Sequence, residues 1–403
     1  MTRKKSAKPP GSFPLKEARM FQIARAILRS VHHGRWYYAV LYIAIVSCEH
    51  PDDRGAMLPG DFELLAEPCT GCEIALHQIA SLGGEEDFAS VSLDAWAQMC
   101  AVTRTGTGDF AVGAVVGGGQ VLIYSTGGSL KGSIGRPGEG PGEFGSDISV
   151  VGGKADTLYV LDQGNARLQT FTLDGRVVGS FRLPRRIASF AVLDRPRFLL
   201  HPRPVPFGQG DSTLFYFLSA DGNLVGRAGD TREYTRTSPW PWLVAPASSG
   251  GFWQARSGGY VIRRHDTEGS VATTLRRNVD WFPTEQTIDM GSYSSSPPQP
   301  AITHIWEDSD RRLWVFAAVA DANWVPRPAS PLTPEWARDQ HDMMVEVIDP
   351  SNRRVIASSA FDGWLAPVCG TELMFQIVET PAGNTRIQIV RPELRDPDSS
   401  SRN

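Results

Sequence analysis

The sequence predicts an all-β fold: a six-bladed β-propeller whose last blade is completed by a strand from the N-terminal part of the chain. The stretch from Gly132 to Pro184 contains four short strand patterns joined by tight turns, which together make one blade. Its hairpin turn recurs along the chain at intervals of about 47 residues, a spacing typical of propeller blades. The last repeat lacks one strand, and a strand pattern that belongs to no repeat precedes the first one.

The best-defined blade is a four-stranded antiparallel meander. Its strands are expected at Ile148–Val151, Thr157–Leu161, Leu168–Thr172 and Val177–Leu183, which are rich in β-branched and aromatic residues. Asp174-Gly175 predicts the hairpin turn between the last two strands, because glycine accepts the positive φ that such turns require. A sheet of this size cannot bury both of its faces alone, so it must stack against similar sheets.

Copies of the hairpin turn and of the second strand mark five complete blades. The turns stand at Thr126-Gly127, Asp174-Gly175, Asp221-Gly222, Glu268-Gly269 and, in the fifth copy, between Asp349 and Asn352. The second strands are expected at Asp109–Val112, Thr157–Leu161, Arg197–Leu200, Gly251–Gln254 and Arg312–Phe316.

The sixth unit, which begins at Trp364, supplies only three strands. The strand-like segment Cys72–Gly83 has no partner near it in the sequence, so we expect it beside Thr385–Val390 as the outer strand of this blade. Pairing the beginning of the chain with its end closes the ring and removes sheet edges that would otherwise aggregate. The propeller is therefore expected to span residues 69–394, followed by a disordered tail over residues 395–403.

The first 48 residues predict an export signal. Residues 3–35 are basic, and the apolar run Trp36–Val46 is too short to span a bilayer, which needs roughly 20 residues. Ile45-Val46-Ser47-Cys48 resembles the bacterial lipobox, so Cys48 is the expected lipidation site. A buried apolar strand with a chance cysteine is the alternative interpretation, and a start at Met20 would shorten the leader.

The charge of the chain is distributed unevenly. Residues 1–48 contain nine Lys or Arg and one acidic residue, so the remaining chain carries a net charge of −12. An acidic body argues against nucleic acid or an anionic membrane surface as the partner. Residues 49–68 are polar and rich in Pro and Gly, and we expect them to form a tether. The predicted protein is a monomer in the bacterial cell envelope, outside the cytoplasm, that contacts the membrane only through its lipid anchor.

Three segments resemble the NHL-repeat and TolB-like group of six-bladed propellers, of the bacterial lipoprotein type. They are IGRPGEGPGEF from Ile134, LYVLDQGNARLQTFTLDG from Leu158 and CTGCEIALHQIASLG from Cys69. The resemblance implies an extracytoplasmic, ring-shaped binding module. Blades three to five depart from the pattern, because they lack the Asp-x-x-Asn-x-Arg sequence of Asp162, Asn165 and Arg167.

The expected ligand-binding surface is the face that carries the loops between second and third strands and the blade-to-blade loops. These loops contain Trp and Arg, which dominate binding hot spots. We predict that this face binds a protein, peptide or glycan, without a cofactor. In the alternative interpretation several Trp pack between blades, and Asp162 and Arg167 form an ion pair that pins their loop. The candidate ligand-binding residues are Arg136, Glu139, Glu143, Asp162, Arg167, His201, Trp324, Trp336 and His341.

The second hypothesis is a metal-dependent hydrolase or lyase with its site at the propeller channel. His201, His265, His304 and His341 lie within the repeats, and three of them converging on the channel could hold zinc with an open position for water. No HxH or HxxxH spacing, no GxSxG sequence and no nucleotide-binding loop accompanies them. The fifth-blade insertion, Val319–Asp342, is expected to carry a short helix over Thr333–Gln340. We expect it to bind a partner, and the alternative is an insertion without a binding role.

Four cysteines remain after Cys48: Cys69, Cys72, Cys100 and Cys369. An even number in an exported protein predicts disulfides, and four cysteines allow three connectivities. A bond between Cys69 and Cys72 would fasten the seam of the ring. A redox motif would need a βαβ context, and a zinc site would need a second CxxC pair, and the sequence contains neither.

Overall fold

The structure is a computed structural model, and it describes residues 60–66, 69–83, 100–113, 119–145, 148–183, 186–193, 197–202, 213–230, 242–282, 296–326, 340–379 and 385–395. These residues belong to one compact unit, Met57–Asn403. Their regular structure consists of β-strands, and these form six blades of four antiparallel strands each. Blades six and one are joined into one sheet, and two further strands are added to blades four and five. No helix in these ranges is long and apolar enough to cross a membrane.

The first three blades are formed by consecutive strands. Blade one contains β4 (Val102–Arg104), β5 (Phe110–Val112), β6 (Val121–Tyr124) and β7 (Leu130–Ile134). Blade two contains β10 (Ile148–Gly152), β11 (Thr157–Asp162), β12 (Arg167–Thr172) and β13 (Val177–Arg182). Blade three contains β14 (Ile187–Leu193), β15 (Arg197–Pro202), β16 (Thr213–Ser219) and β17 (Leu224–Asp230). Two short parallel strands, β8 (Arg136–Pro137) and β9 (Glu143–Phe144), connect the first two blades.

The remaining blades continue the same order. Blade four contains β18 (Trp242–Pro246), β19 (Phe252–Arg256), β20 (Val261–His265) and β21 (Val271–Arg276). Blade five contains β22 (Ala301–Glu307), β23 (Leu313–Ala320), β24 (His341–Asp349) and β25 (Arg354–Phe361). Blade six contains β26 (Ala366–Cys369), β27 (Met374–Glu379), β28 (Thr385–Arg395) and, as its outer strand, β3 (Glu73–Leu82).

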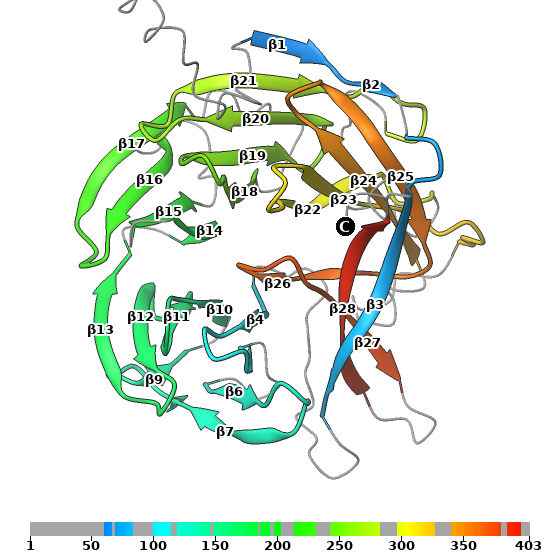
Figure 1. Cartoon of the computed structure of the whole chain (residues 1–403). Helices are drawn as coiled ribbons and strands as arrows, with labels where there is room; N and C mark the ends of the chain where they lie inside the picture. Colours follow the sequence, from blue (N-terminus) through cyan, green and yellow to red (C-terminus); the bar gives the residue numbers. More distant parts are fainter. Residues whose placement is uncertain are drawn as a thin grey trace, which may run out of the picture. The chain divides into compact units, whose positions relative to one another are not determined.

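Figure 1 shows the six blades arranged around a centre, with the first strand of each blade nearest to it. The blades are held together by six apolar clusters, each built from the facing sides of two neighbouring blades. The strand pleat explains this arrangement, because alternate side chains point to opposite faces of a sheet. In β10, Ile148 and Val150 contact blade one, whereas Val151 contacts blade three.

The two ends of the described chain share the sixth sheet. β3 pairs antiparallel with β28, with Leu82 opposite Ile387 and Gln78 opposite Val390. The sequence predicted this pairing, because the sixth blade lacks an outer strand of its own. The inner strand β26 also pairs parallel with β4 of blade one, so backbone hydrogen bonds continue from the last blade into the first.

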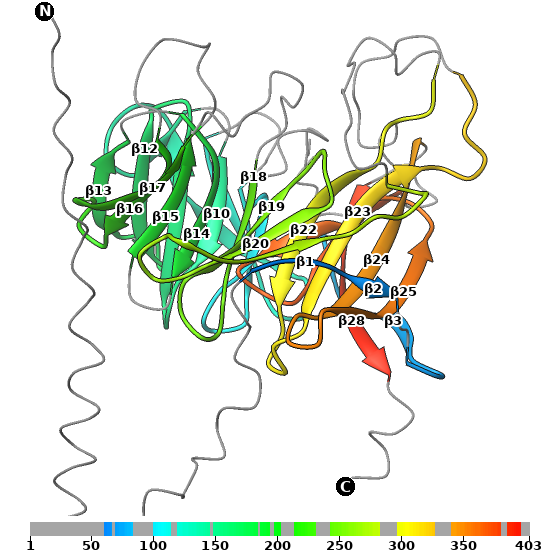
Figure 2. The same cartoon turned by 90° about the horizontal axis from the view of Figure 1, so that it is seen from above.

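Residues 60–66, which the sequence placed in a tether, form two strands instead. β1 (Gly60–Glu63) pairs parallel with β21 on the outside of blade four, and β2 (Leu65–Ala66) pairs parallel with β25 on the outside of blade five. Asp61 accepts hydrogen bonds from the Arg276 guanidinium, with Nε–Oδ1 at 2.8 Å. Figure 2 shows β1, β2 and β3 following one another along three successive blades. We call residues 60–66 the strap.

Two disulfides lie near the seam of the ring. Cys69 is bonded to Cys72 immediately before β3. Cys100 is bonded to Cys369, with their Cα atoms 5.1 Å apart, and joins the segment that precedes β4 to the inner strand of blade six. The expected lipidation site Cys48 and the helix expected over Thr333–Gln340, except Gln340, lie outside the described residues.

Candidate functional site

Five of the predicted ligand-binding residues meet at the junction of blades one and two. Arg136 is exposed and forms an ion pair with Glu143, with Nη2–Oε1 at 2.8 Å. The backbone N–H of Gly140 donates to the other carboxylate oxygen of Glu143 at 2.8 Å. The Gly140 N–H first, and then the Arg136 guanidinium, hold the pKa of Glu143 below its ordinary value. Glu143 therefore uses both of its oxygens to shape its own loop.

The ion pair of Asp162 and Arg167 pins the same loop. Arg167 Nε lies 3.3 Å from Asp162 Oδ2, and the Asp162 side chain is fully buried. Arg167 Nη1 donates to the carbonyl of Glu139 at 2.7 Å, and Nη2 donates to the carbonyl of Glu143 at 2.5 Å. The amide N–H groups of Gly145 and Asn165 donate to Asp162 Oδ1. We call these residues the junction network, and its polar groups are turned toward one another.

His201 belongs to the core and not to a ligand-binding surface. It lies on β15 with no exposed area, and Nδ1 is 3.0 Å from the carbonyl of Leu214, so Nδ1 carries the proton. Its ring centroid is 5.6 Å from that of Phe215. Burial lowers the pKa of His201 to about 4, so the imidazole is neutral at ordinary pH.

Trp324 and His341 both belong to blade five, and Trp324 contacts Gln340, the residue that precedes His341. Trp324 is half-buried and its indole N–H donates to Gln340 Oε1 at 2.7 Å. His341 is buried, and its ring meets the Trp364 ring edge-on with centroids 5.3 Å apart. Trp336 lies outside the described residues. The His341–Trp364 contact lies between blades five and six, whereas Trp324 is bonded inside blade five.

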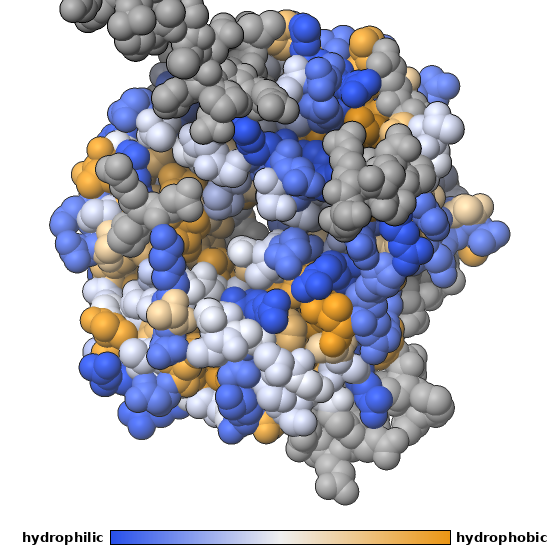
Figure 3. All heavy atoms as spheres, in the orientation of Figure 1, coloured by the Kyte–Doolittle hydropathy of each residue, from blue (hydrophilic) through white to orange (hydrophobic). Residues whose placement is uncertain are grey.

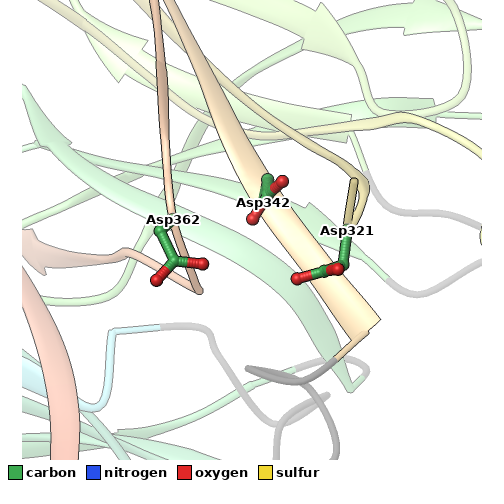
Figure 4. Close-up of side chains that lie close together, drawn as sticks. All are labelled: Asp321, Asp342 and Asp362. Carbon is green, nitrogen blue, oxygen red and sulfur yellow. The ribbon is translucent and has the colours of Figure 1, made fainter. Parts of the chain in front are cut away.

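Three carboxylates that sequence reasoning missed gather next to this region. Asp321 follows β23, Asp342 lies in β24 and Asp362 follows β25, and one oxygen of each lies within 4.8 Å of the others (Figure 4). Oxygen ligands of this kind suit a hard cation such as Ca²⁺. Backbone N–H groups already donate to two of them: Ala322 to Asp342 at 3.1 Å and Asn323 to Asp321 at 2.6 Å. No spacing in the sequence indicates this group, because the three Asp residues come from the ends of three different strands.

The four repeat histidines do not assemble a zinc site. Within the described ranges, the three Asp residues are the only group of three or more metal-ligating side chains close enough to share an ion. The rings of His201 and His265 lie beside Phe215, with centroids 5.6 and 5.8 Å from that of its ring. His304 and His341 belong to blade five, on strands that are not neighbours in the sheet. The hypothesis that three of them converge on the channel is therefore wrong for the described residues, and of the four only His304 lines the central cavity.

A cavity of about 900 Å³ opens at the centre of the ring. Its walls are the inner strands β10, β14, β18, β22 and β26, the end of β28, and turns that join first and second strands. In Figure 3 the space-filling surface is hollowed at this centre. In an antiparallel sheet these turns lie at the opposite end from the loops between second and third strands. The cavity is therefore on the face opposite to the one predicted.

The walls of this central cavity differ in character around the ring. Blades three, four and five present half-buried apolar side chains: Val192, Leu193, Leu243, Val244 and Trp306. Blades two and six present exposed charged side chains: Lys154, Glu372, Arg391 and Glu393. Apolar side chains that face open space with a few polar groups beside them are the usual composition of a ligand pocket.

The rim of the central cavity is held by hydrogen bonds. The Trp306 ring stacks on Trp314 with centroids 5.1 Å apart. The Glu307 carboxylate accepts hydrogen bonds from the Ser248 N–H at 3.2 Å, from the Ser248 hydroxyl and from the Trp253 indole. His304 also lines the cavity, and burial lowers its pKa to about 3, which keeps the ring neutral. These contacts fix the positions of Trp306 and Glu307 at the rim.

Comparisons with known proteins agree with this architecture. Residues 117–238 match the model of a family, DUF5128, described as a 6-bladed beta-propeller. The chain is a six-bladed β-propeller. It is similar in structure to a Bacteroides fragilis protein whose name suggests that it is exported, with a TM-score of 0.52 and 9% identity over 83% of this chain and 100% of the other. No curated protein matches this propeller in sequence.

A second solved structure, a member of the duf4221 family from Bacteroides vulgatus, has a TM-score of 0.56 and 11% identity. The alignment covers 81% of this propeller and 99% of the other chain. At such identities the similarity concerns the fold alone.

Proposed function

We propose that this protein is an exported binding propeller that holds a peptide segment of its ligand in the central cavity. The observation that carries the proposal is a cavity of about 900 Å³ in which apolar side chains from three blades face open space. Cavities of roughly 300–1,000 Å³ with such walls are typical of ligand sites. The junction network is less suited to this role, because the carboxylates of Glu143 and Asp162 already pair with the guanidinium groups of Arg136 and Arg167.

The strand edges around the cavity favour a peptide over a glycan. β10, β14, β18 and β22 are each the last strand of their sheet, on the side nearest the centre. Such edges present backbone N–H and C=O groups that an extended peptide can pair with. The apolar wall around Trp306 and Leu243 then accommodates apolar side chains of the peptide.

Export and lipid anchoring belong to the same proposal. The apolar run before Cys48, the acidic body and two disulfides support a location outside the cytoplasm. The similarity to a protein whose name suggests export and the NHL-like segments around Gly132–Pro184 support it as well. Metabolic labelling with a fatty acid, compared between the full chain and a Cys48→Ser variant, tests the anchor. Equal labelling of both would rule out lipidation at this cysteine.

The binding proposal is tested with a displayed library of random peptides. Enriched peptides are measured against the full propeller and against Trp306→Ala and Leu243→Asp variants. We expect the affinity to fall at least about tenfold in both, because a buried aromatic or apolar anchor contributes on the order of 1–3 kcal/mol. Trp324→Ala, on the opposite face, is the matched control and should bind normally. A loss in Trp324→Ala with normal binding by the cavity variants would place the site on the loop face instead.

A further inference from the structure

The inner strands do not contribute equally to the central cavity, and β22 contributes most. With the turn that follows it, β22 lines the cavity over every residue from 303 to 309, whereas β14 contributes residues 189–193 and β18 residues 243–246. β22 is the last strand of its sheet and pairs with β23. Figure 1 shows it beside the centre of the ring, between β18 and β26. A ligand in the cavity therefore meets the edge of β22 over a longer stretch than that of β14 or β18.

The edge of β22 has a hydrogen-bond partner only near its start. The Ile302 N–H donates to the carbonyl of Ser257 at 2.9 Å, and the Ser257 hydroxyl donates to the carbonyl of Ile302 at 2.6 Å. Ser257 follows β19 in blade four, so these bonds leave β22 on the side away from β23. Among the described residues, no hydrogen bond from outside β23 reaches the backbone of residues 303–307. This stretch of the edge can therefore pair with a further strand.

Alternate side chains of β22 point to different neighbouring blades. Ile302 and Ile305 pack in the apolar cluster between blades four and five, and Trp306 packs against the cluster between blades five and six. A bulge between Ile302 and His304 accounts for the spacing of three residues between the two Ile. A strand added to β22 would continue the sheet of blade five. Its side chains would therefore also point alternately toward blade four and toward blade six.

The side toward blade four is apolar. Leu243 of β18 lines the cavity, is half-buried and packs against the cluster between blades four and five. Ala245 and Pro246 of the same strand also line the cavity. An apolar side chain that points this way is removed from water together with the exposed part of Leu243, which is favourable. A charged side chain in the same place would lose water without gaining a partner.

The side toward blade six is charged and open to water. Glu372, Arg391 and Glu393 line the cavity there and are exposed. Arg391 Nη2 lies 3.7 Å from Glu372 Oε1, and Glu393 Oε2 lies 3.0 Å from His77 Nε2. Exposed ion pairs of this kind are weak and stay hydrated, so this wall accepts polar side chains without requiring one sign of charge. The Trp306 ring offers the aliphatic stem of a long polar side chain a surface to pack on.

We propose that the ligand of the central cavity is an extended peptide that adds a strand to β22 and carries apolar side chains at every second position. The apolar side chains face Leu243, and the polar side chains between them face blade six. The inference rests on the peptide site proposed above and adds to it the docking strand and the pattern of the ligand. β14 is the competing edge, because it also lies between the apolar blade four and a charged wall, that of Lys154 in blade two.

The probes are synthetic octapeptide pools of identical composition, half Val, Leu or Ile and half Thr, Lys or Gln. The apolar residues stand at every second position in the first pool, at helical spacing in the second and in one block in the third. We expect the alternating pool to bind the full propeller at least about tenfold more tightly than the others in fluorescence anisotropy. Leu243→Asp should abolish this preference. Val178→Asp, at an exposed apolar position on the outer strand of blade two, is the matched control and should keep it.

Each result of this comparison decides between the two proposals. Equal binding of the three pools overturns the alternating pattern but not the peptide site. A preference that survives in Leu243→Asp overturns the contact with blade four. Failure of all three pools to bind overturns the peptide site and the pattern together.

A photoreactive side chain then locates the docking strand. A benzophenone replaces one apolar side chain of a binding alternating peptide, or the polar side chain next to it, and mass spectrometry identifies the crosslinked residues of the propeller. We expect the first peptide to label Leu243 and its neighbours and the second to label blade six around Glu372, with excess unlabelled peptide suppressing both. Labelling of blade two around Lys154 by the second peptide overturns the assignment to β22. Labelling of one wall by both peptides overturns the alternation, and labelling around Trp324 overturns the cavity as the site.

Discussion

The junction network and the central cavity differ in whether their side chains have partners within the protein. At the junction Arg136, Glu143, Asp162 and Arg167 satisfy one another and the loop backbone at distances of 2.5–3.3 Å. In the central cavity apolar side chains such as Val244 and Trp306 are left facing open space. The residues that look most reactive in the sequence therefore stabilise a loop, whereas ordinary apolar residues line the cavity in which we propose that a ligand binds.

The largest effect is expected when the junction network is broken from one side. Arg167→Leu leaves the Asp162 carboxylate buried without its partner and should lower the free energy of unfolding by about 3–5 kcal/mol. Arg136→Leu, which removes an exposed partner of Glu143, should lower the free energy of unfolding much less, because water and salt screen an exposed ion pair. Urea unfolding of the two variants checks the contrast. Similar losses in both would mean that burial does not distinguish the two ion pairs.

The disulfide in the wall of the cavity is expected to have the next largest effect. Cys100 and Cys369 both line the central cavity and are 269 residues apart in the chain. Replacing both with Ser should cost about 2–4 kcal/mol, since the bond restricts a long loop in the unfolded chain. The Cys69–Cys72 bond spans only three residues, and its removal should cost less. Urea unfolding decides, and a larger loss from the short loop would contradict the ordering.

The third effect depends on pH. The pKa of His201 is about 4 in the folded protein and near 6.5 when unfolded. Between these values the unfolded chain binds a proton that the folded chain does not, so stability falls as the pH is lowered from about 6.5 to about 4. The full difference is about 3 kcal/mol.

A His201→Gln variant provides the control for this titration. Its amide can still donate to the Leu214 carbonyl, but it does not titrate. The stability difference between the two proteins should therefore narrow toward acid pH in unfolding experiments. A difference that stays constant from neutral to acid pH would show that His201 is accessible to protons in the folded state.

The smallest effect on stability is expected from a Val→Thr substitution, made once in the core and once in the cavity wall. Val160→Thr places a hydroxyl in a fully buried wall between blades one and two and should cost about 1–3 kcal/mol. Val244→Thr makes the same change at a half-buried position of the cavity wall and should cost less than about 1 kcal/mol. In turn, Val244→Thr should weaken peptide binding where Val160→Thr does not. Unfolding and binding curves of both variants check this, and an equal loss of stability would place Val244 in the core.

The repeat of the blades was predictable because it depends on short sequence patterns, namely turn residues and alternating strand residues. Asp174-Gly175 and Asp221-Gly222 stand between the third and fourth strands of blades two and three, as their turn chemistry requires. The missing strand of blade six likewise pointed to the segment that became β3. A glycine turn and an alternating strand pattern act within a few residues, so one sequence suffices to read them.

The strap and the histidines were misread because their environment is created by distant residues. Residues 60–66 carry no strong strand pattern and become strands only where the edges of β21 and β25 are available. His201 ends an apolar strand, and its burial depends on Phe215 and Leu214 of the next strand. The cluster of Asp321, Asp342 and Asp362 unites three strand ends with no common spacing.

The sequence by itself determined the number of blades, the turns that separate their strands and the partner of the first long strand, because these depend on local backbone preferences and on counting strands. Only the tertiary structure decided which polar groups satisfy one another, which apolar side chains face a cavity and on which end of the ring that cavity opens. Those properties depend on how neighbouring sheets approach, and stacking places residues from different blades within a few ångströms of each other.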